Sequence, residues 1–242
     1  MRLLIIRHGD PDYEVDGLTQ QGQIEARLLA ERLYKTESID HFYVSSYGRA
    51  RLTAKPTLEK FGKTGEICDW LHEFDTRVTW EEGNHASLAW DVLPRIFTEK
   101  ENAFLPDAWW QDPALMQAGI KEAYDHVNEE MDRVLSRHGY DRCGRYYTAR
   151  ENNKETIAFF CHFGVEVVLL SHILNLSPIP LWQGTIALPT GITELVTEER
   201  EKGIAYFRLN RFGDVAHLTM NGEVPSFSGR FCETYEDFSQ RH

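Results

Sequence analysis

The chain has 242 residues, of which 42% are apolar, and it carries a formal net charge of −12. This length and composition suit one large domain, or one domain with an insertion. The negative charge argues against nucleic acid or an anionic membrane as a partner. An anionic substrate would therefore need a local basic pocket within an acidic surface.

Neither the cysteines nor the apolar runs indicate an exported or membrane protein. The four cysteines, Cys68, Cys143, Cys161 and Cys232, have neither metal-ligand nor redox-motif spacing, which favours free thiols in a reducing cytosol. Only four consecutive apolar residues precede Arg7, too few for a signal peptide, and no run reaches the roughly 18 residues of a membrane helix. We expect a cytoplasmic protein, and the sequence does not indicate its oligomeric state.

The first seventy residues predict alternating strands and helices. The pattern predicts a buried strand over 2–7, a helix that begins near Thr19, a strand over 42–44, a helix from about Gly48 to just before Gly62, and a short edge strand over 66–68. Residues 74–116 differ, because they hold four of the six tryptophans and little regular period. We expect an insertion or cap over the sheet, partly helical over 85–97, with an ordinary packed excursion that has its own small core as the alternative.

The second half continues the alternation. It predicts an amphipathic helix over 117–137, a surface loop over 141–154, a buried strand over 156–160, a helix from about Val165, and paired strands over 192–197 and 205–210. Such alternation predicts an α/β fold with a mainly parallel central sheet flanked by helices. We expect residues 1–242 to form a single domain, with the insertion at about 74–116.

Three predicted strand ends carry residues suited to phosphate. The first is followed by Arg7-His8-Gly9, the second by Ser45-Ser46 and Arg49, and a later one by His162 and Gly164. In open α/β sheets the carboxyl ends of parallel strands converge, and ligands bind there. Guanidinium groups match phosphate geometry, and a neutral imidazole can attack phosphorus to form a covalent intermediate. From the residues alone, either His8 or His162 could be the nucleophile, while the serines are expected to cap the following helix.

In this order and spacing, the motifs resemble the histidine phosphatase superfamily, which includes the cofactor-dependent phosphoglycerate mutases. The resemblance covers most of the chain and rests on Arg7-His8-Gly9, Leu18 to Gly22 with Ala26, Ser45-Ser46 followed by Arg49-Ala50 and Thr53-Ala54, His162-Phe163-Gly164, and Pro189 to Leu195. It implies a phosphoglycerate mutase-like three-layer sandwich.

The resemblance also implies roles for individual residues. His8 matches the nucleophile that becomes phosphohistidine, and Arg7, Arg49 and His162 match the rest of the phosphate pocket. Glu73 is the best match to the proton donor, an acid whose pKa must be raised by burial or by nearby negative charge. Asp10 is the rival donor, because it directly follows the first motif.

Two departures from the family pattern bear on function. If Ser45-Ser46 is the family's serine pair, Arg49 comes one residue early, whereas matching Ser45 to the second serine restores the register. Mutases of the family carry a long asparagine-bearing segment after the first motif and a basic region for the substrate carboxylate. Here the acidic segment 10–14 follows instead. This difference favours a phosphatase over a mutase.

The sequence therefore predicts a metal-independent phosphatase that hydrolyses a small phosphomonoester through His8, without a cofactor. The alternatives are a phosphoglycerate mutase and a non-catalytic phosphate-binding module. A divalent-ion site on Asp10, Asp12 and Asp16 is a weaker possibility, because the rest of a ligand set is missing. His85, Arg77 and Arg95 are weak candidates for substrate specificity. The sequence does not reveal which phosphoester is the substrate.

Overall fold

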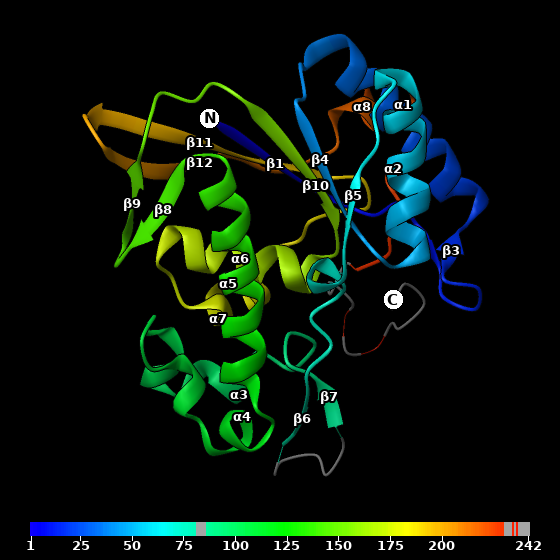
Figure 1. Cartoon of the computed structure of the whole chain (residues 1–242). Coiled ribbons are helices and arrows are strands. Elements are labelled where there is room, and N and C mark those ends of the chain that lie inside the picture. The colour runs from blue at the N-terminus through cyan, green and yellow to red at the C-terminus, as the bar shows by residue number, and fades with distance from the viewer. Residues whose placement is uncertain (81–85, 230–233, 235, 237–242) are drawn as a thin grey trace.

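The computed structural model describes residues 1–80, 86–229, 234 and 236, and an eight-stranded sheet runs through its centre (Figure 1). The strand order is β5-β4-β10-β1-β11-β12-β9-β8. The bounds are β1 Arg2–Arg7, β4 His41–Ser45, β5 Glu66–Cys68, β8 Tyr140–Cys143, β9 Tyr146–Ala149, β10 Thr156–Cys161, β11 Ile192–Glu201 and β12 Ile204–Asp214.

One half of this sheet is parallel and holds the strands that the sequence predicted. β1 pairs with β10, β10 with β4, and β4 with the edge strand β5, all in parallel. The pairs from β1 through β11, β12 and β9 to β8 are antiparallel. The α/β class, with parallel strands flanked by helices, is confirmed, and an antiparallel half extends the sheet beyond them.

Helices cover both faces of the sheet because buried side chains alternate along its strands. In β1, Leu3 and Ile5 join a core with helices α5 (Ile120–Arg137) and α6 (Phe163–Leu174). Leu4 and Ile6 point the other way, toward helices α1 (Gln20–Thr36) and α2 (Gly48–Phe61). The result is three layers, with α1 and α2 on one face and α5 and α6 on the other (Figure 1).

The tryptophan-rich segment differs from its prediction. It contains β6 (Arg77–Thr79), β7 (Ala86–Leu88), α3 (Arg95–Thr98), η2 (Glu101–Phe104), η3 (Trp109–Gln111) and α4 (Pro113–Gln117). The expected helical character over 85–97 is wrong for most of that range, because Ala86–Leu88 pairs with β6 as a strand and the helix begins only at Arg95. A separate small core is also wrong, because Trp80 and Trp109 belong to the core beneath α5 and α6. His85 lies outside the described residues.

The predicted loop over 141–154 is also wrong, because residues 140–149 form the hairpin of β8 and β9. Although the sequence of this hairpin is polar, two of its tyrosines, Tyr140 and Tyr147, are almost fully buried. Tyr147 pairs with Ala205 of β12, so the hairpin continues the sheet. Gly144 makes the turn at φ +60°, a conformation that glycine adopts without a steric penalty.

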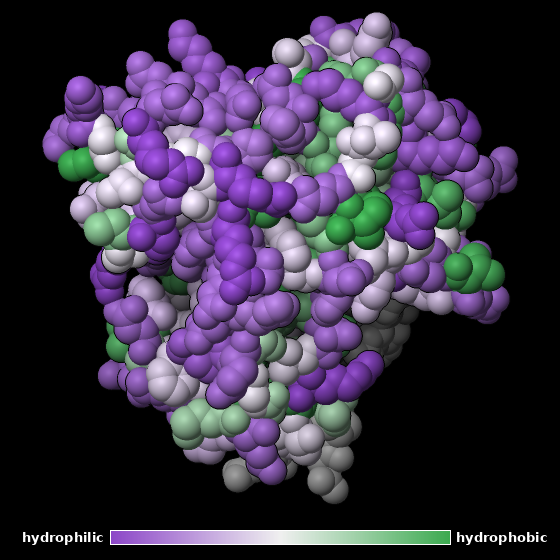
Figure 2. Space-filling model, in the orientation of Figure 1, coloured by the Kyte–Doolittle hydropathy of each residue, from purple (hydrophilic) through white to green (hydrophobic). Residues whose placement is uncertain are grey.

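Five further short elements complete the described fold: β2 Pro11–Asp12, β3 Gly17–Leu18, η1 Asp69–Leu71, α7 Pro178–Gly184 and α8 Ala216–Thr219. The face of the molecule in Figure 2, which α5 crosses, is mainly hydrophilic with scattered apolar residues. Within the described part of the chain, no helix is both long and apolar enough to span a bilayer.

The start of α1 is fixed against the segment that follows β1. Thr19 caps the helix by accepting a hydrogen bond from the Gly22 amide at 3.0 Å, as the sequence predicted. Gly22 lies directly against the backbone of Asp10, because a Cβ built on Gly22 would come within 2.2 Å of the Asp10 carbonyl oxygen. A glycine is therefore required at this position, where helix and loop pack backbone to backbone.

We predict that Gly22→Ala lowers the free energy of unfolding by about 1–3 kcal/mol, the usual cost of an overpacked site. Gly184→Ala is the matched control, because a Cβ on Gly184, at the end of α7, meets nothing within 4 Å. We expect this control to leave stability unchanged or to raise it by less than about 1 kcal/mol. Urea unfolding of both variants measures the difference, and equal stabilities would contradict the backbone contact.

Candidate active site

The parallel pairing of β1 and β10 brings two histidines together. Arg7 is the register partner of Cys161, so His8 and His162 follow neighbouring strands at the same edge of the sheet. The amide of His8 donates to the Cys161 carbonyl at 2.9 Å, and the two imidazole centroids lie 5.0 Å apart. The convergence of strand ends that the sequence predicted therefore brings these two rings into one buried site.

His8 is held in one tautomer. Its Nδ1 lies 2.7 Å from the carbonyl oxygen of Gly9, which can only accept, so Nδ1 carries the proton and Nε2 is left with its lone pair. Burial, together with the positive charges of Arg7 and Arg49, holds the pKa of His8 well below its usual range. The ring is therefore neutral near pH 7, with a nitrogen that can act as a nucleophile.

His162 is also buried and neutral. Burial is the main cause that lowers the pKa of His162, and the neighbouring His8 and Arg49 lower it further. Its Nε2 lies 2.9 Å from the hydroxyl oxygen of Ser45, while its Nδ1 is buried without a hydrogen-bond partner. A phosphate oxygen could use such a donor, and an anion at this place would raise the pKa of both imidazoles.

The expected capping role of the serines is wrong. Helix α2 has Tyr47 as its N-cap residue and no side-chain cap. The hydroxyl of Ser45 instead contacts His162 and accepts from the Tyr47 amide at 3.3 Å. The cause is the start of the helix at Gly48, which leaves Ser45 as the last residue of β4 and within reach of the imidazole.

Arg49 lies in the first turn of α2 and is held by Asp16, which sequence reasoning considered only as a metal ligand. The guanidinium donates to Asp16 at 2.5 Å, and the other oxygen of that carboxylate accepts from the Gly48 amide at 2.6 Å. The aromatic rings of Tyr47 and Tyr13 lie 4.7 and 5.5 Å from the guanidinium carbon. These contacts fix the direction of Arg49 while its Nε remains without a partner.

Arg7 is almost fully buried at the end of β1. Its Nη1 donates to the Ala187 carbonyl at 2.6 Å and, more weakly, to the Ser228 carbonyl at 3.4 Å. Burial lowers the pKa of Arg7, and its Nε makes no hydrogen bond. Gly229 packs against the guanidinium, since a Cβ there would lie 2.4 Å from Nη1.

Glu73 lies where helix α6 begins. Its Oε1 accepts from the amides of Phe74 at 2.7 Å and Val165 at 3.1 Å. Burial raises the pKa of Glu73, although these amides and Arg7 partly oppose the shift. Gly164 is required here, because a Cβ would come within 2.6 Å of the carboxylate and 2.4 Å of the Trp90 indole nitrogen. The side chain is thus a half-buried acid held against the first turn of α6, which directly follows His162.

Asp10 has a different environment. Its Oδ2 accepts from the Thr19 hydroxyl at 2.6 Å, and its Oδ1 accepts from the Ser228 hydroxyl at 2.6 Å and from the Ser226 hydroxyl. All three hydroxyl groups contact the carboxylate oxygens of Asp10, so both oxygens are engaged in structural hydrogen bonds. Asp10 therefore joins α1 to the segment near the C-terminus.

The weaker candidates from the sequence do not form one cluster. Asp10, Asp12 and Asp16 make separate contacts with Thr19, the Glu14 amide and Arg49, so the proposed divalent-ion cluster is wrong. Arg77 and Arg95 are exposed, on β6 and in α3.

Sequence reasoning missed two buried acids. Glu25 of α1 accepts from the Asp10 amide at 2.7 Å and the Ser226 amide at 3.2 Å, and burial raises its pKa to about 7. Glu166, one turn into α6 from His162, accepts from the Thr193 hydroxyl, and burial raises its pKa to about 8. In both cases the sequence places a glutamate on the apolar side of a predicted helix, and this pattern could have identified a buried acid.

Thr190 was missed as well. Its amide donates to the carbonyls of Arg7 at 3.1 Å and His8 at 3.2 Å, and its φ is +58°. This left-handed conformation is strained for a β-branched residue, and such strain gathers at functional sites. The hydroxyl of Thr190 contacts His217 at 2.9 Å. Thr190 thus fixes the backbone carbonyls of Arg7 and His8.

We predict that Glu166→Gln stabilises the protein increasingly as the pH rises. A carboxyl whose pKa is raised in the folded state favours folding at low pH, and this contribution is lost between its unfolded pKa, about 4.3, and its folded pKa, about 8. The glutamine keeps an acceptor for Thr193 but cannot ionise. The difference in unfolding free energy between variant and parent should grow by on the order of 3 kcal/mol from pH 5 to pH 8. Urea unfolding at both pH values measures it, and a constant difference would contradict the neutral buried acid.

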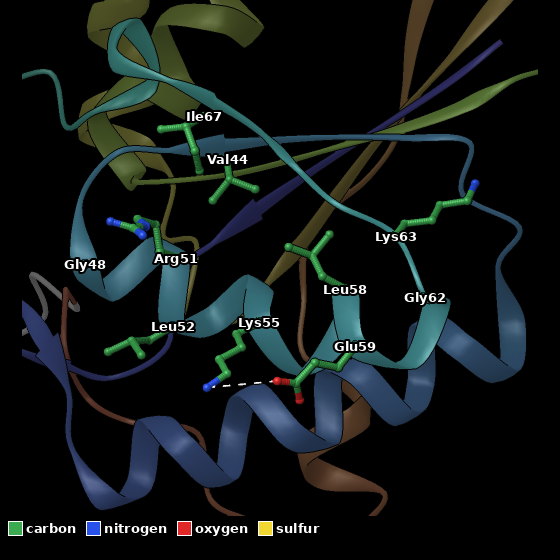
Figure 3. Close-up of a pocket in the computed structure, with 10 residues that line it drawn as sticks. All are labelled: Val44, Gly48, Arg51, Leu52, Lys55, Leu58, Glu59, Gly62, Lys63 and Ile67. Carbon is green, nitrogen blue, oxygen red and sulfur yellow. Dashed lines mark ion pairs between the residues drawn. The ribbon is translucent and has the colours of Figure 1, made fainter.

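A cavity of about 570 Å³ lies between α2 and the β4–β5 edge of the sheet (Figure 3). Val44 and Ile67 line it from the sheet side. Lys55 and Glu59 line it from α2 and form an ion pair. None of the phosphate-binding candidates lines this cavity, so it is separate from the histidine pair.

Comparison with known proteins decides the family. Residues 3–210 match the histidine phosphatase superfamily (branch 1). The chain belongs to this superfamily. It is 25% identical over 149 residues to "Phosphoglycerate mutase-like protein 4" of Arabidopsis thaliana, a match that spans 58% of this chain and 63% of that protein.

Solved structures of the superfamily share the fold. A mutant phosphoserine phosphatase from Entamoeba histolytica in complex with phosphoserine is 18% identical, with a TM-score of 0.60 over 90% of this chain and 98% of that one. An alpha-ribazole phosphatase from Shigella flexneri is 20% identical, with a TM-score of 0.55 over 89% and 98%. A mycobacterial glucosyl-3-phosphoglycerate phosphatase is 17% identical, with a TM-score of 0.54 over 87% and 98%.

Proposed function

We propose that this histidine phosphatase family member is a phosphatase that hydrolyses a small phosphomonoester through a phosphohistidine on His8. The observation that carries the proposal is the orientation of His8, whose Nδ1–H is held by the Gly9 carbonyl while Nε2 stays unprotonated in a cationic, buried site. The charges of Arg7 and Arg49 act on this imidazole, and the centroid of the His162 ring lies 5.0 Å from its own. Together they suit the charge on the oxygens of a phosphoryl group in transfer.

The first step transfers the phosphoryl group to the protein. His8 Nε2 attacks phosphorus, the bond to the leaving oxygen breaks, and Glu73 donates its proton to that oxygen. Arg7, Arg49 and His162 donate to the nonbridging oxygens and offset their charge. In the second step the Glu73 carboxylate takes a proton from water, water attacks phosphorus, and the nitrogen–phosphorus bond breaks to release phosphate.

Glu73 suits the acid role better than Asp10. Burial raises the pKa of Glu73, so a larger fraction carries the proton that the leaving oxygen needs. Both carboxylate oxygens of Asp10 are already engaged by the hydroxyl groups of Thr19, Ser226 and Ser228, which join α1 to the segment near the C-terminus. The reaction so written needs no metal and no cofactor.

The proposal extends to the segment over 74–116 as a cover of the site and to the location of the protein. Trp90 of this segment donates to the Phe74 carbonyl at 2.7 Å, next to Glu73. Its indole could therefore contact the leaving group.

Among the described cysteines, Cys143 is free and exposed, which supports a reducing cytosol as the compartment.

We predict that His8→Ala lowers phosphate release from a responsive phosphoester by more than about 10³-fold, because no covalent intermediate can form. His126→Ala is the matched control, an exposed histidine of α5 far from the motifs in sequence. A phosphate-release screen over sugar phosphates, phosphoglycerates, nucleotides and phosphopeptides identifies the ester, and circular dichroism checks folding. Turnover by His8→Ala near the parent rate would refute the nucleophile.

The same screen separates the alternatives. A mutase would interconvert phosphoglycerates with little net phosphate release. A binding module would retain phosphate or a phosphoester without turnover. Full activity in excess chelator is expected of the metal-independent reaction.

We predict that Glu73→Gln slows hydrolysis of an alkyl phosphate by about 10²–10⁴-fold, the usual contribution of a general acid. The loss should be much smaller for p-nitrophenyl phosphate, whose leaving group departs without a proton. In the parent, phosphoryl transfer from the alkyl ester should fall as the pH rises through the raised pKa of Glu73, and the variant should lack this limb. Single-turnover rates measure the transfer step, with Asp10→Asn as the comparison. Equal losses with both esters would exclude Glu73 as the acid.

A further inference from the structure

Two histidines and a glutamate meet at the opposite end of the parallel strands from His8. His41 begins β4, Glu155 directly precedes β10, and His138 ends α5 as its C-cap residue. Their side-chain ligand atoms all lie within 4.8 Å of one another. β10 separates Glu155 from the catalytic edge, a distance of roughly 20 Å at the usual rise of a strand.

We propose that His41, His138 and Glu155 form a zinc-binding site. The Glu155 carboxylate lies 3.6 Å from His41 Nε2 and 2.7 Å from His138 Nδ1. Ligands that each lie about 2.0 Å from a tetrahedral zinc ion are roughly 3.3 Å apart, so small side-chain shifts would suffice. Two imidazoles and one carboxylate favour zinc over magnesium, which prefers oxygen ligands.

The surrounding residues can orient these ligands. The Tyr43 hydroxyl lies 2.8 Å from His138 Nε2 and can donate to that nitrogen or accept from it. When zinc takes Nδ1, the imidazole proton moves to Nε2 and is donated to Tyr43. The Asn153 amide donates to Glu155 at 3.0 Å and to the His138 carbonyl at 2.8 Å. Such partners outside the ligand set fix the tautomer and the direction of metal ligands.

Charge and exposure are compatible with a bound cation. Glu155 contributes a carboxylate to the site, beside the two imidazoles. The nearby Arg137 forms a two-pronged ion pair with Glu66, at 3.0 and 3.1 Å, which offsets its positive charge. The side chains of His41 and Glu155 are 50% and 39% exposed, so a metal ion can enter and water can supply a fourth ligand.

The test is a zinc titration of the metal-free full-length chain by calorimetry, with and without single substitutions. We expect one zinc per chain, and an affinity at least about tenfold weaker in His41→Gln and in Glu155→Gln. His126→Gln is the matched control and should bind zinc like the parent. Zinc should also raise the Tm of the parent but not of His41→Gln.

The catalytic histidines need their own control, because His8 and His162 could hold zinc themselves. The titration is therefore repeated with His8→Ala, which should keep the parent's affinity. The proposal is overturned if the parent binds no zinc. The contacts of Glu155 with His41 and His138 would then be a hydrogen-bonded ion pair only. It is equally overturned if zinc binds but His41→Gln and Glu155→Gln leave the affinity unchanged. Phosphatase activity does not enter this test, so its outcome is independent of the proposed function.

Discussion

The register between β1 and β10 is the constraint on which the candidate site depends. Six consecutive backbone pairs, from Arg2 with Thr156 to Arg7 with Cys161, fix where each strand ends. A slip of one residue would turn every side chain to the opposite face. Leu3 and Leu4 would then exchange cores, so the packing of both helical layers holds the register. The 5.0 Å separation of the imidazoles is thus a consequence of core packing on either side of the sheet.

The same site contains two positively charged side chains, Arg7 and Arg49, whose mutual repulsion the surrounding structure has to offset. Among the described residues, buried Arg7 donates to two carbonyl oxygens, while Arg49 has a carboxylate partner in Asp16. Burial, with a further contribution from these positive charges, lowers the pKa of both imidazoles, so the two guanidinium groups carry the positive charge near them. This arrangement suits an anion, because a bound phosphate would offset the positive charge of the two guanidinium groups. Glu25 and Glu166 fit this arrangement, since raised pKa values keep part of their population neutral at pH 7.

The sequence predicted the strands and helices whose ends carry this chemistry, because apolar periodicity and capping residues are local signals. Thr19, Gly48 and Gly62 mark helix ends as expected. The hairpin of β8 and β9 was missed because its burial depends on pairing with β12, a contact that no local pattern records. Asp16 and Thr190 were missed for the same reason, since each acts through a partner that the fold brings to it. Placement of Ser45 against His162 likewise depends on β4 and β10 being neighbours.

The two ends of the parallel strands offer different environments to a histidine. At the carboxyl end, burial lowers the pKa of His8 and His162, and the positive charges of nearby arginines lower it further, so both rings are neutral in a site that favours an anion. At the amino end, His41 and His138 face one carboxylate, and the nearby Arg137 is already paired with Glu66. An imidazole next to an anionic ligand selects a cation. The direction of the parallel strands therefore places histidines in two different environments, one that suits the proposed phosphoryl transfer and one that suits the proposed zinc site.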